Sequence, residues 1–238
     1  PYMWYFGESQ PVTIQQLRDN HGGMIVVGDK LFDFNNEDPV TTVATGSAVA
    51  PEEDGVLLTG ILEGDDWGLK FNGSWSAAVN ESANTTITFS VTALDRSLLI
   101  HDNALWMTAF GVDTGVNDLI EDARVSISET VFSAEPTAAN IDDGTAEVLA
   151  DKLVRWLGLG HPSNDIYDDQ IYAEALRTVW VKKDIGVHGG MIYPDTDPDS
   201  PASFAHLSEF YQTFSQIPEP STLALVGLGG LALLRRRR

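Results

Sequence analysis

The chain has 238 residues, 43% of them hydrophobic, so it can bury a core and is not a disordered polyelectrolyte. Its net charge of −21 gives a surface that repels nucleic acid and anionic lipid head groups. There is no cysteine, which excludes disulfides, thiolate metal sites and a cysteine nucleophile.

The N-terminal end starts at Pro1 and is rich in aromatic residues over positions 1–6. It lacks the charged region and the longer apolar region of a signal peptide. Either a signal peptide has been cleaved or the sequence is a fragment that begins late. We therefore expect a missing N-terminus.

Apolar residues alternate with polar ones in several stretches of the chain. Successive side chains of a strand point to opposite faces, so such stretches predict strands with one buried and one solvated face. Antiparallel sheets tolerate a solvated face, and Gly, Asn, Asp and Pro clusters separate the stretches. The sequence predicts an all-β fold, an antiparallel β-sandwich of the jelly-roll type. The alternating stretches are residues 67–75, 86–93, 124–128 and 179–187, with Lys183 as the one interruption of the last.

Residues 145–157 show a different period. Leu149, Leu153 and Trp156 have helical spacing, and Gly158 follows at a position that can end a helix. This pattern favours one short helix over 145–157. A pair of strands stays open as the alternative, because neighbouring strands can override local propensity.

Five tryptophans raise the question of sugar stacking, namely Trp67, Trp75, Trp106, Trp156 and Trp180. Trp67 and Trp75 share an alternating face with Leu69, and such a face favours the core. Trp180 falls on the opposite face from Val179 and is the best candidate for an exposed aromatic residue.

Two acidic stretches are candidates for a calcium site, since Ca²⁺ prefers several oxygen ligands. The first holds Asp195, Asp197 and Asp199, and the second holds Glu63, Asp65 and Asp66. In the first stretch Pro198 and Pro201 replace the Gly turn of an EF-hand loop, and no Glu closes the site. A solvated acidic loop is the favoured interpretation of both stretches. We expect no metal site or other cofactor, with calcium as the alternative, first of all at Asp195, Asp197 and Asp199.

Catalytic motifs are missing from the sequence. There is no nucleophile elbow, phosphate-binding loop or dinucleotide fingerprint. The five histidines form no zinc-binding pattern, and they are His21, His101, His161, His188 and His206. We expect no enzymatic activity.

The C-terminal end combines three features. Pro218, Glu219, Pro220 and Ser221 come first, an uncharged apolar run to residue 234 follows, and the chain ends with Arg235, Arg236, Arg237 and Arg238. The run is too short for a comfortable membrane span, which takes about 20 residues. The arginines predict a cytoplasmic end and therefore a body on the outer side.

This arrangement resembles the PEP-CTERM sorting signal, which exosortase-type membrane transpeptidases of Gram-negative bacteria recognise. An ordinary short C-terminal anchor is the alternative. The resemblance implies cutting near the Pro-Glu-Pro motif and a link to exopolysaccharide and biofilm matrix. Residues 23–32, 99–105, 181–185 and 212–216 also resemble PEP-CTERM β-sandwich proteins that have no assigned activity.

We therefore expect a β-sandwich domain over residues 1–214 and a sorting tail over 215–238 with a short apolar helix. The resemblance implies export to the cell envelope, outer surface or extracellular matrix, with transient anchoring of the C-terminus in the inner membrane. The implied partners are an exosortase, the membrane and exopolysaccharide, and nucleic acid is not one of them. The favoured function is a non-catalytic surface or matrix protein. The alternatives are a carbohydrate-binding module and a polysaccharide-active enzyme.

Overall fold

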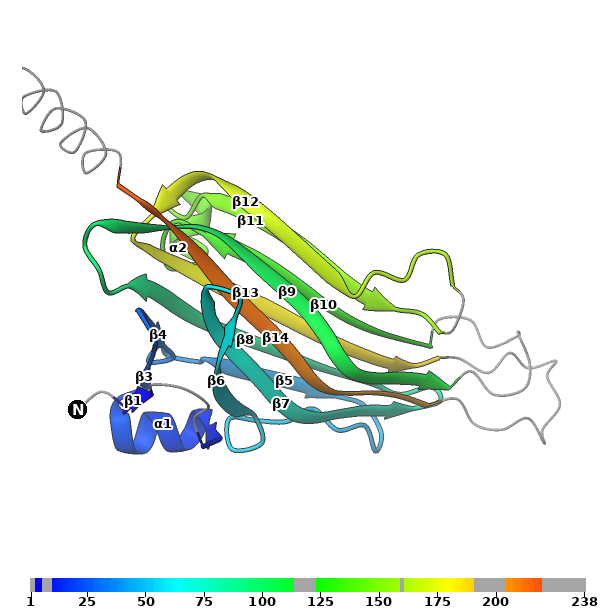
Figure 1. Ribbon diagram of the computed structural model, residues 1–238. Coiled ribbons are helices and arrows are strands. Elements are labelled where there is room, and N and C mark those ends of the chain that lie inside the picture. Colours follow the sequence, from blue (N-terminus) through cyan, green and yellow to red (C-terminus); the bar gives the residue numbers. More distant parts are fainter. Residues whose placement is uncertain (1–2, 6–9, 114–122, 159–160, 191–203, 220–238) are drawn as a thin grey trace, which may run out of the picture.

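Two β-sheets pack face to face in the computed structural model, which describes residues 3–5, 10–113, 123–158, 161–190 and 204–219 (Figure 1). Sheet A has the order β1 (Met3–Tyr5), β3 (Met24–Val27), β4 (Lys30–Asp33), β8 (Ser82–Ala93), β13 (Thr178–Gly189), β10 (Ala123–Phe132) and β11 (Val148–Trp156), with β5 (Val40–Ala44) also paired to β8. Sheet B has the order β12 (Tyr167–Leu176), β9 (Leu98–Asp113), β14 (Phe204–Pro218), β7 (Asp66–Ala78), β6 (Leu57–Glu63) and β2 (Val12–Thr13). Within the described residues, the helices are α1 (Ile14–His21) and α2 (Ala138–Asp142).

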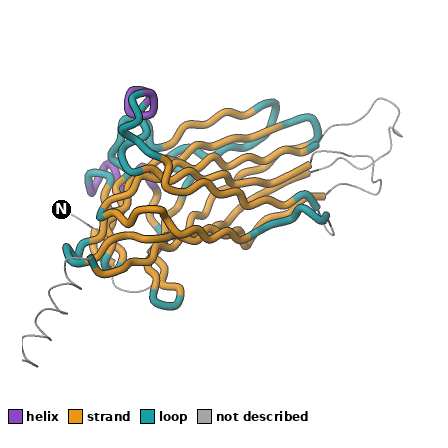
Figure 2. The backbone as a smooth tube through the Cα atoms, turned by 90° about the horizontal axis from the view of Figure 1, so that it is seen from above, coloured by secondary structure: helices purple, strands orange, loops and turns teal. Residues whose placement is uncertain are grey.

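Neighbouring strands are antiparallel apart from β1 and β3, which run parallel. The predicted strands at 67–75, 86–93, 124–128 and 179–187 lie within β7, β8, β10 and β13. The prediction of an antiparallel β-sandwich is confirmed. The long strands run lengthwise, and many of the connecting loops gather at the two ends (Figure 2).

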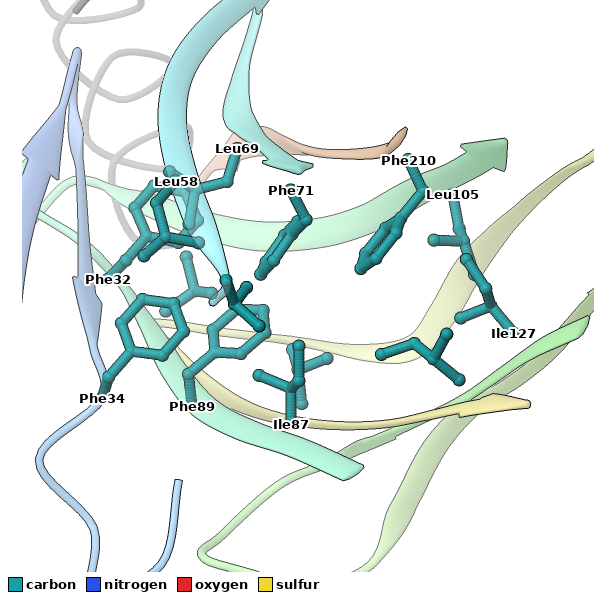
Figure 3. Packing of buried hydrophobic residues seen from close by; sticks show 14 of the residues in the cluster. Phe32, Phe34, Leu58, Leu69, Phe71, Ile87, Phe89, Leu105, Ile127 and Phe210 are labelled. Atoms are coloured by element: carbon teal, nitrogen blue, oxygen red, sulfur yellow. The ribbon is translucent and has the colours of Figure 1, made fainter. Parts of the chain in front are cut away.

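The core between the sheets is rich in phenylalanine (Figure 3). Phe71 of β7 stacks on Phe210 of β14 with ring centroids 4.7 Å apart, and Phe34 stacks on Phe89 of β8 at 4.9 Å. All four side chains are fully buried. Each of these two pairs belongs to one sheet. The sheets meet where Phe71 packs against Phe89 and where Phe32 of β4 packs against Phe214 of β14, both with ring centroids 5.9 Å apart. Aromatic side chains bury large areas, so these rings contribute strongly to the packing of sheet A on sheet B.

The predicted helix at 145–157 is wrong, because this segment contains strand β11. It pairs with β10 from Val125 opposite Trp156 to Phe132 opposite Val148. Leu153 points away from the core and is 43% exposed. The helical spacing of Leu149 and Leu153 therefore does not mark the buried side of this segment. Long pairing with β10 has overridden the local pattern. The nearby helix is α2, which comes before this segment.

Helix α1 was not predicted, although its start carries a recognisable signal. The Thr13 hydroxyl accepts a hydrogen bond from the Gln16 backbone N–H at 3.0 Å, and the Gln16 side chain accepts one from the Thr13 N–H at 3.1 Å. This reciprocal pair is a capping box, readable as Thr-x-x-Gln. Ile14 and Leu17 are fully buried and attach the helix to the core.

Candidate functional site

An open groove of about 650 Å³ lies on the outer face of sheet B. On β9 the groove residue Trp106 alternates with the buried Leu105 and Met107, as expected for a strand with one face in the core. The groove is lined by residues of the β6–β7 hairpin, β9, β12 and β14: Glu63, Asp66, Asp102, Ala104, Trp106, Thr108, Tyr167, Asp169, Tyr211, Thr213 and Ser215.

Three aromatic side chains form a row across the strands. Tyr167 of β12 is opposite Trp106 of β9, and Trp106 is opposite Tyr211 of β14. The Trp106 and Tyr211 rings are stacked, 5.3 Å apart with an interplanar angle of 3°, and Trp106 and Tyr167 are 6.3 Å apart and tilted by 39°. Tyr167 is 54% exposed. We call these three residues the aromatic row.

Small side chains lie beside the aromatic row. In the next register position Asp169 is opposite Ala104, and Ala104 is opposite Thr213. One position further Asp102 is opposite Ser215. Because Ala, Thr and Ser are short, the surface is lower here than at the aromatic row, which gives the groove its depth.

Glu209 of β14 fixes one end of the aromatic row. Its carboxylate accepts hydrogen bonds from the Tyr211 hydroxyl at 2.6 Å, the Thr108 hydroxyl at 2.8 Å and the Asn72 amide at 2.9 Å. The Lys70 ammonium lies 3.5 Å from the same carboxylate. Burial would raise the pKa of Glu209, but these three hydrogen bonds and the Lys70 charge lower it to about 2. Glu209 is thus ionised at neutral pH and holds the Tyr211 ring in place.

The carboxylates of the groove influence one another. Partial burial raises the pKa of Asp66, and the negative charge of Asp102 raises it further. Burial also raises the pKa of Tyr167, with Asp169 adding to the effect. The groove is therefore acidic, with carboxylate acceptors beside an aromatic surface.

The five tryptophans considered for sugar stacking occupy different places. Trp75 is fully buried and Trp67 is packed against the core, as predicted. Trp156 packs against Phe110 at 5.2 Å. Trp180 is half-buried on the outer face of sheet A, and Trp106 is the one that lines the groove.

Sequence reasoning missed the two tyrosines of the aromatic row. A signal was present, since Tyr211 is next to the buried Phe210 and so belongs to the outer face of its strand. The pairing that brings Tyr167 and Tyr211 to Trp106 depends on the order of β12, β9 and β14, which the sequence does not reveal.

The acidic candidates have different outcomes. Asp195, Asp197 and Asp199 lie outside the described residues. Glu63 and Asp66 line the groove. Across the described ranges, no group of three or more His, Asp or Glu side chains is arranged to hold a metal ion.

The start of the predicted sorting tail is part of sheet B. Strand β14 continues past residue 214 to Pro218, which is opposite Leu98, and the Glu219 N–H donates a hydrogen bond to the Ser97 carbonyl at 2.8 Å. Pro220, Ser221, the predicted apolar helix and Arg235 to Arg238 lie outside the described residues. Among the described residues, no helix has both the length and the apolar character that crossing a membrane requires.

Comparison with solved structures gives weak matches of 10–11% identity. TmCBM61 in complex with β-1,4-galactotriose matches with a TM-score of 0.28 at 10% identity, covering 74% of this chain and 89% of that one. The enzymatically active domain of bacteriophage CBA120 tailspike protein 4 matches with a TM-score of 0.27 at 10% identity, covering 76% of this chain and 20% of that one. The family 11 carbohydrate-binding module of the Clostridium thermocellum cellulase Lic26A-Cel5E matches with a TM-score of 0.23 at 11% identity, covering 82% and 96%. At such TM-scores the similarity carries no functional information.

Comparison with curated proteins finds no match. Residues 216–238 match the family described as the PEP-CTERM protein-sorting motif. This motif implies an exported protein that is sorted to the cell surface and processed by an exosortase. The chain is thus a β-sandwich protein with a PEP-CTERM sorting motif at its C-terminal end.

Proposed function

We propose that this protein is a non-catalytic surface protein that binds a neutral polysaccharide through the groove on sheet B. The observation that carries the proposal is the aromatic row beside a strip of small residues and carboxylates. Aromatic rings offer large apolar surfaces to the C–H faces of sugar rings at low cost in conformational entropy. Carboxylates accept hydrogen bonds from sugar hydroxyl groups.

The charge of the groove favours a neutral ligand. Glu63, Asp66, Asp102 and Asp169 all line it, and the whole chain has a net charge of −21. A polysaccharide with carboxylate, sulfate or phosphate groups would meet like charges at short range. The proposed ligand is therefore a neutral glycan of the cell's own surface or matrix, where the sorting motif directs the protein.

Affinity electrophoresis tests this function. The purified chain is run through gels that contain neutral polysaccharides (β-glucan, galactan, mannan) or acidic ones (alginate, pectate). We expect at least one neutral polysaccharide to retard the protein and the acidic ones to have no effect. Retardation by none of the neutral polysaccharides, or by the acidic ones alone, would show that the proposed ligand class is wrong.

Two tryptophan variants locate the binding surface. Trp106→Ala removes the centre of the aromatic row and should abolish retardation. Trp180→Ala removes a half-buried aromatic residue from the outer face of sheet A and is the matched control. Equal loss in both variants would contradict binding at the groove. Release of reducing ends from the bound polysaccharide would contradict the non-catalytic part of the proposal.

Export and processing have a separate test. When the chain is expressed with an exosortase, we expect the surface form to lack Arg235 to Arg238. Intact-mass measurement on the surface form decides the matter, and the arginines would remain attached if the tail were an ordinary anchor.

A further inference from the structure

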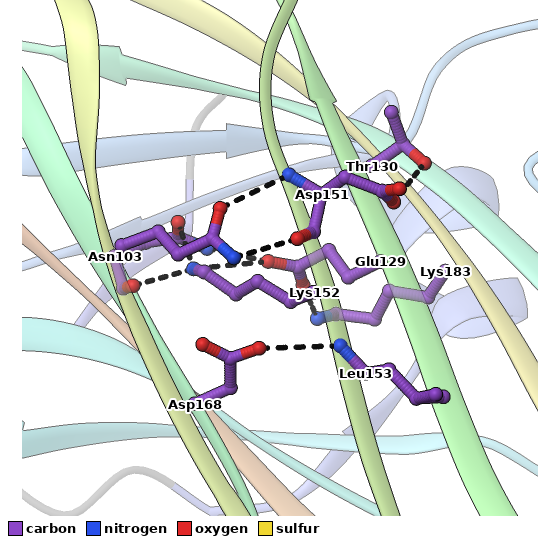
Figure 4. Close-up of polar contacts among 9 residues, drawn as sticks. Asn103, Glu129, Thr130, Asp151, Lys152, Leu153, Asp168 and Lys183 are labelled. Atoms are coloured by element: carbon purple, nitrogen blue, oxygen red, sulfur yellow. Dashed lines mark hydrogen bonds and ion pairs between the residues drawn. The ribbon is translucent and has the colours of Figure 1, made fainter.

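A cluster of four polar side chains lies inside the sandwich (Figure 4), on the opposite face of sheet B from the groove. It consists of Asn103 of β9, Glu129 of β10, Lys152 of β11 and Lys183 of β13. Asn103, Glu129 and Lys183 are 0% exposed, and Lys152 is 2% exposed. Charged side chains are almost never this buried unless they are paired, so the arrangement calls for an explanation.

The contacts place an amine, an amide and a carboxylate together. The Lys152 Nζ contacts the side-chain oxygen Oδ1 of Asn103 and donates to the Asn103 backbone carbonyl at 2.5 Å. The Asn103 Nδ2 donates to Glu129 Oε1 at 2.5 Å, and the Lys152 Nζ is 3.5 Å from the same oxygen. One carboxylate oxygen therefore faces both the amine nitrogen and the amide nitrogen. Lys183 contacts the other oxygen of Glu129.

We propose that the side chains of Lys152 and Asn103 react with each other to form an amide crosslink, with Glu129 carrying the protons. The crosslink would join β11 of sheet A to β9 of sheet B. No cofactor or co-reactant is needed, since the amine, the amide and the proton carrier all belong to the chain. This inference does not depend on the proposed glycan binding.

The reaction balances in atoms and charge. The Lys152 ammonium gives one proton to the Glu129 carboxylate, and its Nζ then forms a bond to Cγ of Asn103. The bond from Cγ to Nδ2 breaks, and Nδ2 leaves as ammonia after taking a proton through Glu129. Nζ then loses a second proton, which ammonia takes up to become ammonium. Glu129 ends as the carboxylate with which it began. Nothing is oxidised or reduced.

The environment favours the nucleophilic form of Lys152. Burial lowers the pKa of Lys152, although the charge of Glu129 opposes this effect. A buried amine near a carboxylate that can accept its proton is the usual arrangement of a nucleophilic lysine. The contacts also hold the nitrogen against the amide before reaction, which removes most of the entropic cost of bringing the two groups together.

The charge of the cluster gives the reaction a direction. Before the crosslink forms, Lys152 and Lys183 share the one carboxylate of Glu129, so with both lysines protonated one of the two positive charges has no matching negative charge within the cluster. Burial and, to a smaller extent, the charge of Lys152 lower the pKa of Lys183 to about 8, although Glu129 opposes this effect. The crosslink is neutral and leaves Lys183 and Glu129 as a matched pair. Because an uncompensated buried charge is strongly unfavourable, losing it as ammonium favours the product.

The position in the fold suggests what the crosslink does. On this side of the sandwich, side chains of β12 bond to the backbone of β11: the Asp151 N–H donates to Gln170 at 3.1 Å, and the Leu153 N–H donates to Asp168 at 3.2 Å (Figure 4). Lys152 lies between these two anchors. A covalent link here would lock the side where the edge strands of the two sheets meet.

Mass spectrometry of the full chain under denaturing conditions tests the crosslink. We expect a mass lower than the sequence mass by one ammonia molecule. Trypsin should then give residues 97–124 joined to residues 125–155, with Lys152 uncut because it is acylated. The full sequence mass with separate peptides 97–124 and 125–152 would overturn the proposal, and so would loss of water in place of ammonia.

A matched pair of variants assigns the nucleophile. Lys152→Arg keeps the positive charge but cannot form the crosslink, so it should show the full sequence mass. Lys183→Arg keeps the ion pair with Glu129 and should still lose ammonia. Glu129→Gln should leave the peptides separate. A crosslinked Lys152→Arg would overturn the assignment, and a fully crosslinked Glu129→Gln would overturn the role of Glu129. The wild-type digest decides the proposal even where a variant does not fold.

Discussion

The two faces of β9 show how differently one strand can use its polar residues. Asp102 and Asn103 are neighbours, but Asp102 lines the open groove and Asn103 lies in the core with no exposed surface. A polar side chain on the outer face has water as an alternative partner, so it is free to serve a ligand. A polar side chain in the core needs partners within the protein, since an unpaired buried group is costly. Asn103 has such partners in Glu129 and Lys152.

The largest effect is expected inside the sandwich. Glu129→Leu leaves two buried lysines without their carboxylate and should reduce the free energy of unfolding by about 3–5 kcal/mol, because breaking a buried pair leaves uncompensated charge. Urea denaturation followed by tryptophan fluorescence measures the change. Glu209→Leu, at a carboxylate near the surface, is the control and should lose clearly less. Equal losses in the two variants would show that burial of the cluster does not matter.

Two neighbours on β9 should separate stability from binding. Leu105→Ala removes a fully buried side chain and should cost about 2–5 kcal/mol of stability without changing glycan affinity in the folded protein. Trp106→Ala should cost less stability and weaken glycan binding at least tenfold, which is about 1.4 kcal/mol. Calorimetry for affinity and urea denaturation for stability provide the test. Loss of glycan binding in Leu105→Ala, or unchanged binding in Trp106→Ala, would contradict the assignment of stability to the inner face of β9 and of binding to its outer face.

Acid should weaken the contribution of Glu209. Its pKa is about 2 in the folded protein, below the ordinary value of 4.5, so the stability that it provides is fully present above about pH 4.5. That stability falls as the pH decreases towards 2. Thermal melting between pH 7 and pH 2 should therefore show a smaller loss for Glu209→Gln than for the wild type. Parallel curves for the two proteins would argue against the hydrogen bonds that hold Tyr211.

The smallest effect is expected at Asp66. Partial burial and the charge of Asp102 raise its pKa above the ordinary value of 3.8. At neutral pH the ionised Asp66 carboxylate therefore destabilises the folded state. Asp66→Asn should raise the melting temperature slightly at pH 7 and leave it unchanged at pH 3, where both forms are neutral. A decrease at pH 7 would mean that the Asp66 carboxylate has a stabilising partner.

The sequence predicted most of the fold, because alternation directly reports which face of a strand is buried. The stretches around Trp75, Phe89, Ile127 and Val181 were assigned correctly for this reason. The segment around Leu153 was assigned wrongly, because helical spacing in a short window does not show that a neighbouring strand is available for pairing.

The candidate sites could be predicted less well. Trp106 was among the tryptophans considered, but the row with Tyr167 and Tyr211 exists only through pairing between β12, β9 and β14. Lys183 interrupted an apolar face and was an unused hint of a buried ion pair. Its partner Glu129 belongs to another strand, so only the register of β10 against β13 brings them together.

The most direct test of the groove is the indole N–H signal of each tryptophan in a nuclear magnetic resonance titration. The ligand is an oligosaccharide from the neutral polysaccharide that binds, and Trp→Phe variants assign the signals. We expect the Trp106 signal to shift on binding, with Trp75 and Trp180 unchanged. A shift of Trp180 with Trp106 unmoved would place binding on sheet A and contradict the role of the aromatic row.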